Sequence, residues 1–279
     1  MTLVALAELG RGVILPDTPV LHADDEGVLR GRSVFETLRV YGGMPFMLRA
    51  HLDRLARSAA QLRLPEPPRD AFEQAAFDAI GAGGELDVSL RFLWTAGREG
   101  GGSPAGLVLV STLPPDLEDL RARGLRIAAV EWAAGSLAGA KSTSYAANMA
   151  AQSDAAARGA DDALLVAYDG TVLEAPTSNV WFREGERLLT PSLALPLLPG
   201  VTRAALCRLA PQAGYVVEEG SFALSRVLGA DEVFLSSSVR EVAPVIAVDG
   251  SEIGDGRPGP AATALQRALR VAAGYPDGA

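Results

Sequence analysis

The sequence predicts an α+β fold in two domains. Segments with strand patterns and segments with helical patterns follow one another irregularly along the chain. A length of 279 residues suits one large domain or two ordinary ones, and 48% hydrophobic residues suffice for a core. A proline-rich acidic connector, "PPDLEDL", forms a predicted interdomain linker at 114–120 between a domain at 1–113 and a second domain at 121–279.

The first domain is expected to combine strands with an amphipathic helix. It opens on the strand "MTLVALAELGRGV", and in "SVFETLRVYGGMPFML" apolar residues on both sides of Gly42–Gly43 predict a β-hairpin. The stretch "LRAHLDRLARSAAQLRL" is typical of a helix with Leu52, Leu55 and Ala59 on one face. Two further strands, "LDVSLRFLWTAG" and "GLVLVSTL", flank the flexible loop "REGGGSPAG".

The second domain begins with the strand "GLRIAAVEW" and an alanine-rich helix that ends at Gly159. Three strands follow, "ALLVAYDG", "TVLEA" and "NVWFREG", with a tight turn at Asp169–Gly170. In "LLPGVTRAALCRLAPQAG" a loop leads into a helix that starts near Val201 or Thr202. The segment "EVFLSSSVREVAPVIAVDG" is expected to form two strands joined by a loop, and "AATALQRALRVAAG" a closing helix.

Composition narrows the classes of function. The formal net charge of −9 argues against nucleic acid or an anionic membrane as a partner, because both require a basic surface. One cysteine, Cys207, excludes an internal disulfide, and two histidines argue against a zinc site, so we expect no metal. The N-terminus has no basic start, and no apolar run is long enough to span a membrane. We therefore expect a soluble, cytoplasmic protein.

Lys141 is the only lysine in the chain, beside 24 arginines. A G+C-rich coding sequence favours arginine, so a single lysine could survive by chance as a surface charge. The chemical alternative is that this position needs an amine. Arginine stays protonated at any useful pH, whereas lysine can lose its proton and form a Schiff base.

Two motifs are suited to binding an anion. In "LLPGVTRAAL" the free N–H groups at a helix start could bind a phosphate, and Thr202 could add its hydroxyl. The alternative, which this motif by itself favours, is an ordinary threonine N-cap. In "FLSSSVREVAPV" three serines follow an apolar strand and could bind a phosphate through hydroxyls and amides. The alternative there is a polar turn.

Two charged residues have both a functional and a structural interpretation. Glu174 ends an apolar strand in "VLEAPTSNVWF" and could face a protonated heterocyclic nitrogen, or it could belong to a surface hairpin. Arg54 shares a helix with Arg49, His51 and Arg57. That helix could present a solvated basic face, or Arg54 could point inward and bind a phosphate bidentately.

Taken together and in order, these motifs resemble one family. Lys141, Glu174, "SNVW", "LLPGVTR" and "SSSVREVAPV" are similar to the pattern of class IV, fold-type IV pyridoxal-phosphate enzymes. That family includes branched-chain aminotransferases, D-amino-acid transaminases, (R)-amine transaminases and 4-amino-4-deoxychorismate lyases. The stretches "GRSVFETLRVYGGMPFMLRAHLDRL" and "VDGSEIGDGRPGP" resemble it too, so the resemblance spans nearly the whole chain.

The resemblance implies a fold, a cofactor and partners. The fold would be a two-domain fold-type IV enzyme, with a smaller N-terminal α/β domain and a larger C-terminal domain that holds a β-barrel-like sheet. Pyridoxal 5'-phosphate would be the cofactor, and a small-molecule amino acid and a 2-oxo acid would be the substrates. The enzyme would be a homodimer with its active site near the subunit interface.

The resemblance also implies roles for individual residues. Lys141 would form the imine with the cofactor, and Glu174 would pair with the protonated pyridine nitrogen. The phosphate would be bound by Arg54, Val201, Thr202, Ser237 and Ser238. Tyr145 would contact the ring hydroxyl, with an offset from the lysine that is one residue shorter than in the family, and Ser178 and Asn179 would line the cofactor's surroundings.

The substrate side departs from the family. Many D-amino-acid transaminases carry an Arg-x-His carboxylate site after the "LRFLWTAG" strand, and here the loop reads "REGGGSP" without a histidine. Phe35 replaces a tyrosine of the preceding hairpin. Arg32 and Arg98 are therefore the candidates for the substrate carboxylate, with a surface position as the alternative for each.

We expect an amino-acid transaminase, with D-amino acids as one option for the donor. The lyase that makes 4-aminobenzoate and pyruvate is the alternative. A non-catalytic binder of the cofactor, or an interaction protein without cofactor, would account for the sequence less well, because both Lys141 and Glu174 are present.

Overall fold

The computed structural model describes residues 1–84 and 86–275, which form two compact units. Unit 1 comprises Met1–Pro115 together with Ala140–Tyr145, and unit 2 comprises Asp116–Gly139 and Ala146–Ala279. Each unit has its own sheet and its own hydrophobic core. The mixture of helices and strands confirms the predicted α+β class.

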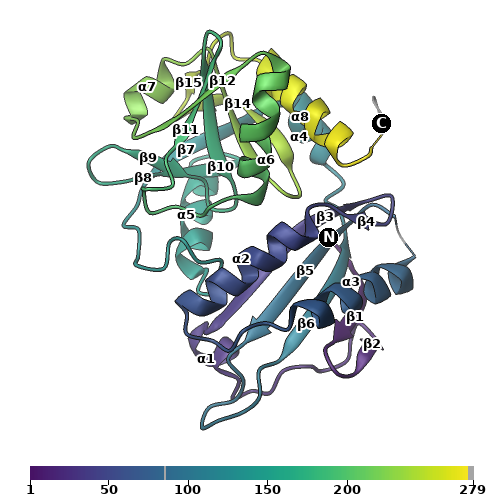
Figure 1. Ribbon diagram of the computed structural model, residues 1–279. Helices are drawn as coiled ribbons and strands as arrows, with labels where there is room; N and C mark the ends of the chain where they lie inside the picture. The colour runs from purple at the N-terminus through teal and green to yellow at the C-terminus, as the bar shows by residue number, and fades with distance from the viewer. Residues whose placement is uncertain (85, 276–279) are drawn as a thin grey trace. The chain divides into compact units, whose positions relative to one another are not determined.

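Unit 1 is built on an antiparallel sheet (Figure 1). Within its described residues the sheet has six strands, which in spatial order are β2 (Gly12–Ile14), β1 (Leu3–Glu8), β6 (Gly106–Thr112), β5 (Val88–Thr95), β3 (Ser33–Tyr41) and β4 (Met44–Pro45). Gly42 and Gly43 join β3 to β4 with φ angles of 54° and 82°, which glycine adopts without strain. The predicted hairpin is confirmed.

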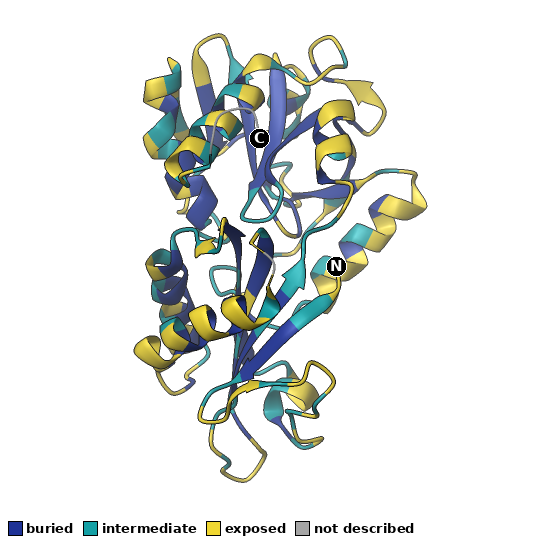
Figure 2. Cartoon of the chain, turned by 90° about the vertical axis from the view of Figure 1, so that its right-hand side faces the viewer, coloured by how far each residue is buried: buried dark blue, intermediate teal, exposed yellow. Residues whose placement is uncertain are grey.

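Helices α2 (Leu48–Gln61) and α3 (Arg69–Gly83) lie along one face of this sheet (Figure 1). The helix predicted for this stretch is α2, and the three residues expected on its apolar face, Leu52, Leu55 and Ala59, are buried. Its outward side remains exposed (Figure 2). A short helix, α1 (Glu26–Arg30), precedes β3.

Unit 2 contains a mixed sheet. Its nine strands in the described part of the chain are β12 (Val216–Gly220), β11 (Arg187–Pro191), β10 (Asn179–Glu184), β13 (Glu232–Ser237), β14 (Glu241–Val248), β7 (Leu125–Glu131), β8 (Asp162–Val166) and β9 (Val172–Glu174), with β15 (Ser251–Glu252) beside β14. The last strand of the row, β9, also contacts β10 and β11, so the sheet curls back on itself.

Helices of unit 2 begin and end at chemically suitable residues. They are α4 (Leu117–Arg123), α5 (Ala146–Ala157), α6 (Val201–Leu209), α7 (Leu224–Leu228) and α8 (Pro260–Ala272), with a 3₁₀ turn η1 at Ala210–Ala213. Part of the predicted linker at 114–120 is helical, because α4 has acidic residues in its first turn and arginines in its last, as the helix dipole favours. Gly159, with φ of 76°, follows α5 where a helix end was expected.

Residues 1–84 and 86–275 contain neither a candidate membrane span nor a candidate metal cluster. The structure there has no helix whose length and hydrophobicity suit a membrane span. In the same residues, no group of three or more His, Cys, Asp or Glu side chains is arranged to bind a metal ion.

Candidate active site

The segment that carries Lys141 docks on the edge of β3. The N–H of Phe35 donates to the carbonyl of Lys141 at 2.9 Å, and the N–H of Thr143 donates to the carbonyl of Ser33 at 3.0 Å. Val34 and Ser142 form an antiparallel bridge between these two bonds. The segment therefore extends the sheet of unit 1 like a very short strand, which fixes the backbone of Lys141.

The side chain of Lys141 lies at an aromatic ring. Its Nζ is 4.5 Å from the centroid of the Phe35 ring, a distance at which a cation is attracted to the ring face. Tyr145 packs against the same ring edge-on, with centroids 5.6 Å apart and an interplanar angle of 86°. Three residues that the sequence singled out, Lys141, Phe35 and Tyr145, thus lie together in unit 1.

A buried ionic cluster lies between α2 and β3. Arg54 donates to both carboxylate oxygens of Glu36, from Nε and from Nη2, each at 2.7 Å. Nδ1 of His51 lies 2.7 Å from the same carboxylate. All three side chains are buried. Of the two alternatives for Arg54, the structure therefore has the inward position, whereas Arg49 and Arg57 are exposed.

The charges of this cluster follow from its geometry. Burial raises the pKa of Glu36, but Arg54 and His51 outweigh burial and lower it to about 2. Burial lowers the pKa of His51 below its usual value, against the effect of Glu36, which raises it. Since an ionised carboxylate only accepts hydrogen bonds, the neutral His51 ring must donate its Nδ1 proton to Glu36.

Glu174 lies at the mouth of a tight turn. Ala175 and Ser178 exchange both backbone hydrogen bonds, at 2.8 and 3.3 Å, across Pro176 and Thr177. Proline at the second position of a turn favours this geometry. The turn places Glu174 directly opposite Asn179, so their side chains share one face of the sheet, and Nδ2 of Asn179 donates to Glu174 at 3.3 Å.

The loop before α6 completes the environment of Glu174. The N–H of Leu198 donates to both carboxylate oxygens at 3.2 Å, and the carbonyl of Leu198 accepts from Asn179 at 3.0 Å. A Cβ at Gly200 would meet Oδ1 of Asn179 at 1.9 Å, so only glycine fits there. Glu174 is thereby held in one orientation by neutral amide donors.

Two candidate phosphate ligands meet in unit 2. Helix α6 begins at Val201, and its N-cap residue is Gly200, without a side-chain cap. Thr202 is therefore not the N-cap of α6, contrary to the structural alternative for this motif. The Thr202 hydroxyl, within the first turn, lies 3.5 Å from the hydroxyl of Ser238 in the turn after β13. The N-terminal amides of α6 and these two hydroxyls form a set of donors for an anion.

The remaining serines of unit 2 differ in their roles. Ser236 belongs to β13 and accepts the indole N–H of Trp181 at 2.9 Å, which makes it structural. The hydroxyl of Ser237 accepts the N–H of Arg240 at 3.3 Å and shapes the turn. The hydroxyl of Ser178 is buried and has no hydrogen-bond partner among the described residues, a condition that a bound ligand would relieve.

The two arginines proposed for the substrate carboxylate already bind carboxylates of the chain. Arg32 forms an ion pair with Glu26. Arg98 binds Asp24 through Nε at 2.9 Å and Nη2 at 2.8 Å, and both side chains are about half exposed. Their role toward a substrate stays a prediction, but each would have to exchange its partner.

Sequence reasoning missed a third arginine, Arg91. It lies on β5 opposite Thr37, to which its Nε donates at 3.4 Å. Its guanidinium carbon is 5.6 Å from the centroid of the Phe35 ring, the ring that Lys141 contacts. Arg91 is exposed, and the available signal was a single charge within the otherwise mostly apolar strand "VSLRFLW". Arg91 lies near Phe35 only because of the register between β3 and β5, and that register cannot be read from the sequence.

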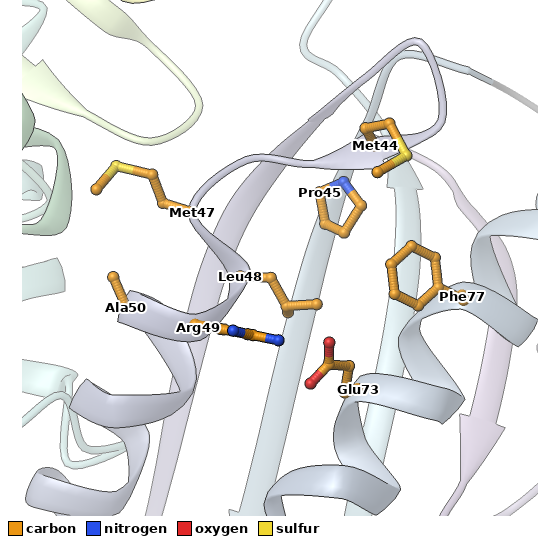
Figure 3. A pocket seen from close by; sticks show the side chains of 8 residues that line it. All are labelled: Met44, Pro45, Met47, Leu48, Arg49, Ala50, Glu73 and Phe77. Carbon is orange, nitrogen blue, oxygen red and sulfur yellow. The ribbon is translucent and has the colours of Figure 1, made fainter. Parts of the chain in front are cut away.

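A surface pocket in unit 1 contains none of these residues. Figure 3 shows it between the β3–β4 hairpin, α2 and α3, where the side chains of Arg49 and Glu73 point toward one another. It is lined by Met44, Pro45, Met47, Leu48, Arg49, Ala50, Glu73 and Phe77. Because it holds no proposed cofactor ligand, it does not locate the chemistry.

Comparison with known proteins gives consistent results. The family model described as "Amino-transferase class IV" matches residues 33–248. A relative from Mycobacterium tuberculosis, named "Bifunctional aminodeoxychorismate lyase / D-amino acid transaminase", is 34% identical over 264 residues, which cover 86% of this chain and 90% of that protein.

Solved structures agree with this result. A hypothetical aminotransferase from Mycobacterium tuberculosis, solved in a form with alpha-ketoglutarate and PMP, is 32% identical with a TM-score of 0.90, covering 96% of this chain and 98% of the other. A fold IV transaminase from Curtobacterium pusillum is 33% identical with a TM-score of 0.88, covering 96% of this chain and 97% of the other.

Proposed function

The chain belongs to the class IV aminotransferases, and we propose that it transfers amino groups between an amino acid and a 2-oxo acid with pyridoxal phosphate as cofactor. The observation that carries this proposal is the placement of the only lysine. Its backbone is fixed on the edge of β3, and its amine lies 4.5 Å from the centroid of the Phe35 ring. A surface charge would need neither feature.

The residues present suit this cofactor. A phosphate ester needs N–H and O–H donors, which the first turn of α6, Thr202 and Ser238 provide. A protonated ring nitrogen needs an oriented carboxylate, and Glu174 is one, held by Leu198 and Asn179. The buried, unpartnered hydroxyl of Ser178 is a further group that a ligand would satisfy.

We propose the following ligands. Lys141 would hold the cofactor covalently through Nζ, and Glu174 would bind the ring nitrogen. Tyr145 would contact the ring hydroxyl, with Ser178 and Asn179 nearby. The phosphate would be bound by Arg54, Val201, Thr202, Ser237 and Ser238. The hydroxyl of Ser237 accepts the N–H of Arg240 with a lone pair, which leaves its own proton for donation to a phosphate oxygen.

Each residue then has a definite task. Bound pyridoxal phosphate supplies an electron sink for a substrate carbon that loses a proton. Lys141, as a free amine, would take the proton from the substrate Cα and return it at the other end of the reacting system. The ionised Glu174 would favour a protonated ring nitrogen. Arg54, whose Nε and Nη2 both donate to the ionised Glu36, would bind the phosphate through its other guanidinium N–H groups.

The substrate carboxylate has three candidate partners. Arg91 is favoured on geometry, because it shares the Phe35 ring with Lys141. Arg32 and Arg98 remain candidates, but each is paired with a carboxylate of its own. We therefore propose that Phe35 contacts the substrate and that Arg91 binds its carboxylate. If Arg91 does not bind the carboxylate, Arg32 or Arg98 would do so.

The lyase reaction is a second candidate function. The relative from Mycobacterium tuberculosis carries both activities in its name, and 86% of this chain aligns with it. The two reactions share the cofactor ligands, so those residues do not separate them.

Two further parts of the proposal are a homodimer, which rests on the resemblance to the family, and a cytoplasmic location, which rests on the composition of the sequence. Light scattering on the purified protein tests the first, since a fully active monomer would contradict it, and fractionation of cells that express the natural gene tests the second.

A panel assay tests the function itself. The purified holoenzyme is given D- and L-amino acids with 2-oxoglutarate or pyruvate, beside aminodeoxychorismate alone. Amino transfer to a 2-oxo acid supports the transaminase. Release of pyruvate and 4-aminobenzoate without amino transfer would replace it with the lyase, and the absence of both would contradict the proposal.

A further inference from the structure

Ser58 binds the backbone of Lys141. Its hydroxyl accepts the N–H of Lys141 at 3.0 Å, although 83 residues separate the two in the chain. On the other side of the same residue, the carbonyl of Lys141 accepts the N–H of Phe35 at 2.9 Å. The lysine backbone is thus held from two directions, by α2 and by β3.

The requirements of a helix do not explain why a serine is buried at position 58. A serine in the middle of a helix usually faces water or donates to the carbonyl four residues before it. Ser58 is instead only 1% exposed, on the inward side of α2. A buried hydroxyl is unfavourable unless it is bonded, and the bond it makes is the one to Lys141.

The helix around Ser58 is itself anchored. Arg54, one turn earlier, forms the two-bond ion pair with Glu36, which is the neighbour of Phe35 on β3. Contacts therefore run in a closed circuit, from Phe35 and Glu36 through Arg54 and Ser58 to Lys141 and back to Phe35. Every member belongs to unit 1. A group within such a circuit is a fixed point, because moving it breaks several contacts at once.

We propose that Ser58 is a positioning residue for the reactive lysine. It fixes the Lys141 Cα, while the Phe35 ring restrains the amine at the other end of the flexible side chain. This inference rests on the proposed function, in which Lys141 carries the cofactor and moves a proton. A displacement of about 1 Å in such a group can cost roughly 100-fold in rate, so a hydroxyl that never touches substrate can still affect turnover.

The first test observes the bond directly. Because Lys141 is the only lysine, protein labelled with [α-¹⁵N]lysine gives one backbone amide signal from this chain. In Ser58→Ala we expect that signal to shift and its hydrogen exchange to accelerate about 10-fold, the size of one net hydrogen bond. Thr190→Val is the matched control, since it removes a buried hydroxyl that donates to the Val180 carbonyl at 2.9 Å in unit 2. It should leave the signal unchanged.

The second test observes the consequence in the holoenzyme. In Ser58→Ala we expect kcat to fall about 10-fold while KM changes less than about 2-fold, as for a lost positioning contact. The pH midpoint of the cofactor's visible absorbance band, which reports the Lys141 linkage, should also move. Ser58→Thr keeps the hydroxyl and should recover both properties. If the alanine variant fails to fold, Ser58→Cys, whose sulfur is a much weaker acceptor, should show the same changes at a smaller size.

The two hypotheses fail in different ways. If a folded Ser58→Ala or Ser58→Cys protein keeps the wild-type amide signal, exchange rate and kcat, Ser58 has no positioning role. If the wild-type protein carries cofactor at a site other than Lys141, the proposed function fails, while the amide signal still reports whether Ser58 holds the lysine backbone.

Discussion

The amine of Lys141 lies 4.5 Å from the centroid of the Phe35 ring. Arg91 lies at the same ring, with its guanidinium carbon 5.6 Å from the centroid. One aromatic side chain of β3 thus brings a candidate nucleophile and a candidate carboxylate ligand into the same neighbourhood. The first prediction concerns this arginine.

Replacing Arg91 with alanine should weaken the use of amino acids about 10- to 100-fold in kcat/KM, the cost of one lost charge-assisted contact. The amine phenylethylamine has no carboxylate, so its turnover should change far less. Steady-state kinetics with both donors measures the ratio.

The matched variants are Arg32→Ala and Arg98→Ala, which remove the same charge from guanidinium groups paired with Glu26 and Asp24. If either of them shows the selective loss and Arg91→Ala does not, the carboxylate binds there instead. Wild-type kinetics in all three would show that another group holds it.

Glu174→Gln should retain the cofactor but lower turnover about 100-fold or more, an order typical of lost electrostatic assistance. The amide keeps the size of the side chain, while a neutral group no longer favours a protonated ring nitrogen. The control is Glu186→Gln, the same chemical change at an exposed position of unit 2. Unchanged turnover in Glu174→Gln would remove this residue from the mechanism.

Thr202→Val should weaken binding of pyridoxal phosphate about 10- to 100-fold, because a hydrogen bond to a charged group is lost. Binding of pyridoxal, which has no phosphate, should be unaffected. Fluorescence titration of the apoenzyme with both compounds separates the two results. Equal weakening of both would mean that the hydroxyl does not face the phosphate.

Stability should fall on acidification in two ranges. The folded-state pKa of His51 lies below 6.5, so below about that pH the unfolded chain takes up a proton that the folded chain does not. The folded-state pKa of Glu36 is about 2 against 4.5, so its contribution is present above about 4.5 and is lost toward 2. Both effects have the same sign, and urea unfolding as a function of pH measures them.

The variant His51→Gln isolates the first range. Glutamine can still donate to Glu36 but does not titrate, so the decline that begins near pH 6.5 in the wild type should become shallower. An identical pH profile in the variant would show that His51 does not contribute.

Local patterns predicted much of the fold. The pair Gly42–Gly43 predicted the β3–β4 hairpin, and both glycines have positive φ in the structure. The Pro-Gly pair before Val201 predicted the start of α6, and Gly200 is its N-cap. Helix α3 was missed, although Phe72, Ala75, Ala76, Ala79 and Ile80 follow helical spacing and are buried. Alanine contributes little hydrophobicity, so its periodicity is weak by eye. The family resemblance and the fold-type IV architecture are confirmed by the comparisons.

The sequence predicted which residues belong to the candidate site better than it predicted the contacts those residues make. Lys141 and Glu174 were identified from the sequence, and their local settings in the structure suit the roles proposed for them. Arg91 and Ser58 were not identified, because each contacts a residue far away in the chain. Arg91 reaches Phe35 through the register between β3 and β5, and Ser58 reaches Lys141 through the packing of α2. Ion pairs such as those of Arg32 and Arg98 likewise depend on loops brought together by folding.

The central claim is that Lys141 binds the cofactor covalently. Reduction of the purified holoenzyme with borohydride, followed by peptide mass mapping, tests it most directly. We expect the visible absorbance to bleach and one reduced cofactor to be found on the peptide that contains Lys141, with no such adduct in Lys141→Ala. A reduced cofactor on any other peptide, or an unmodified Lys141 in active enzyme, would contradict the account.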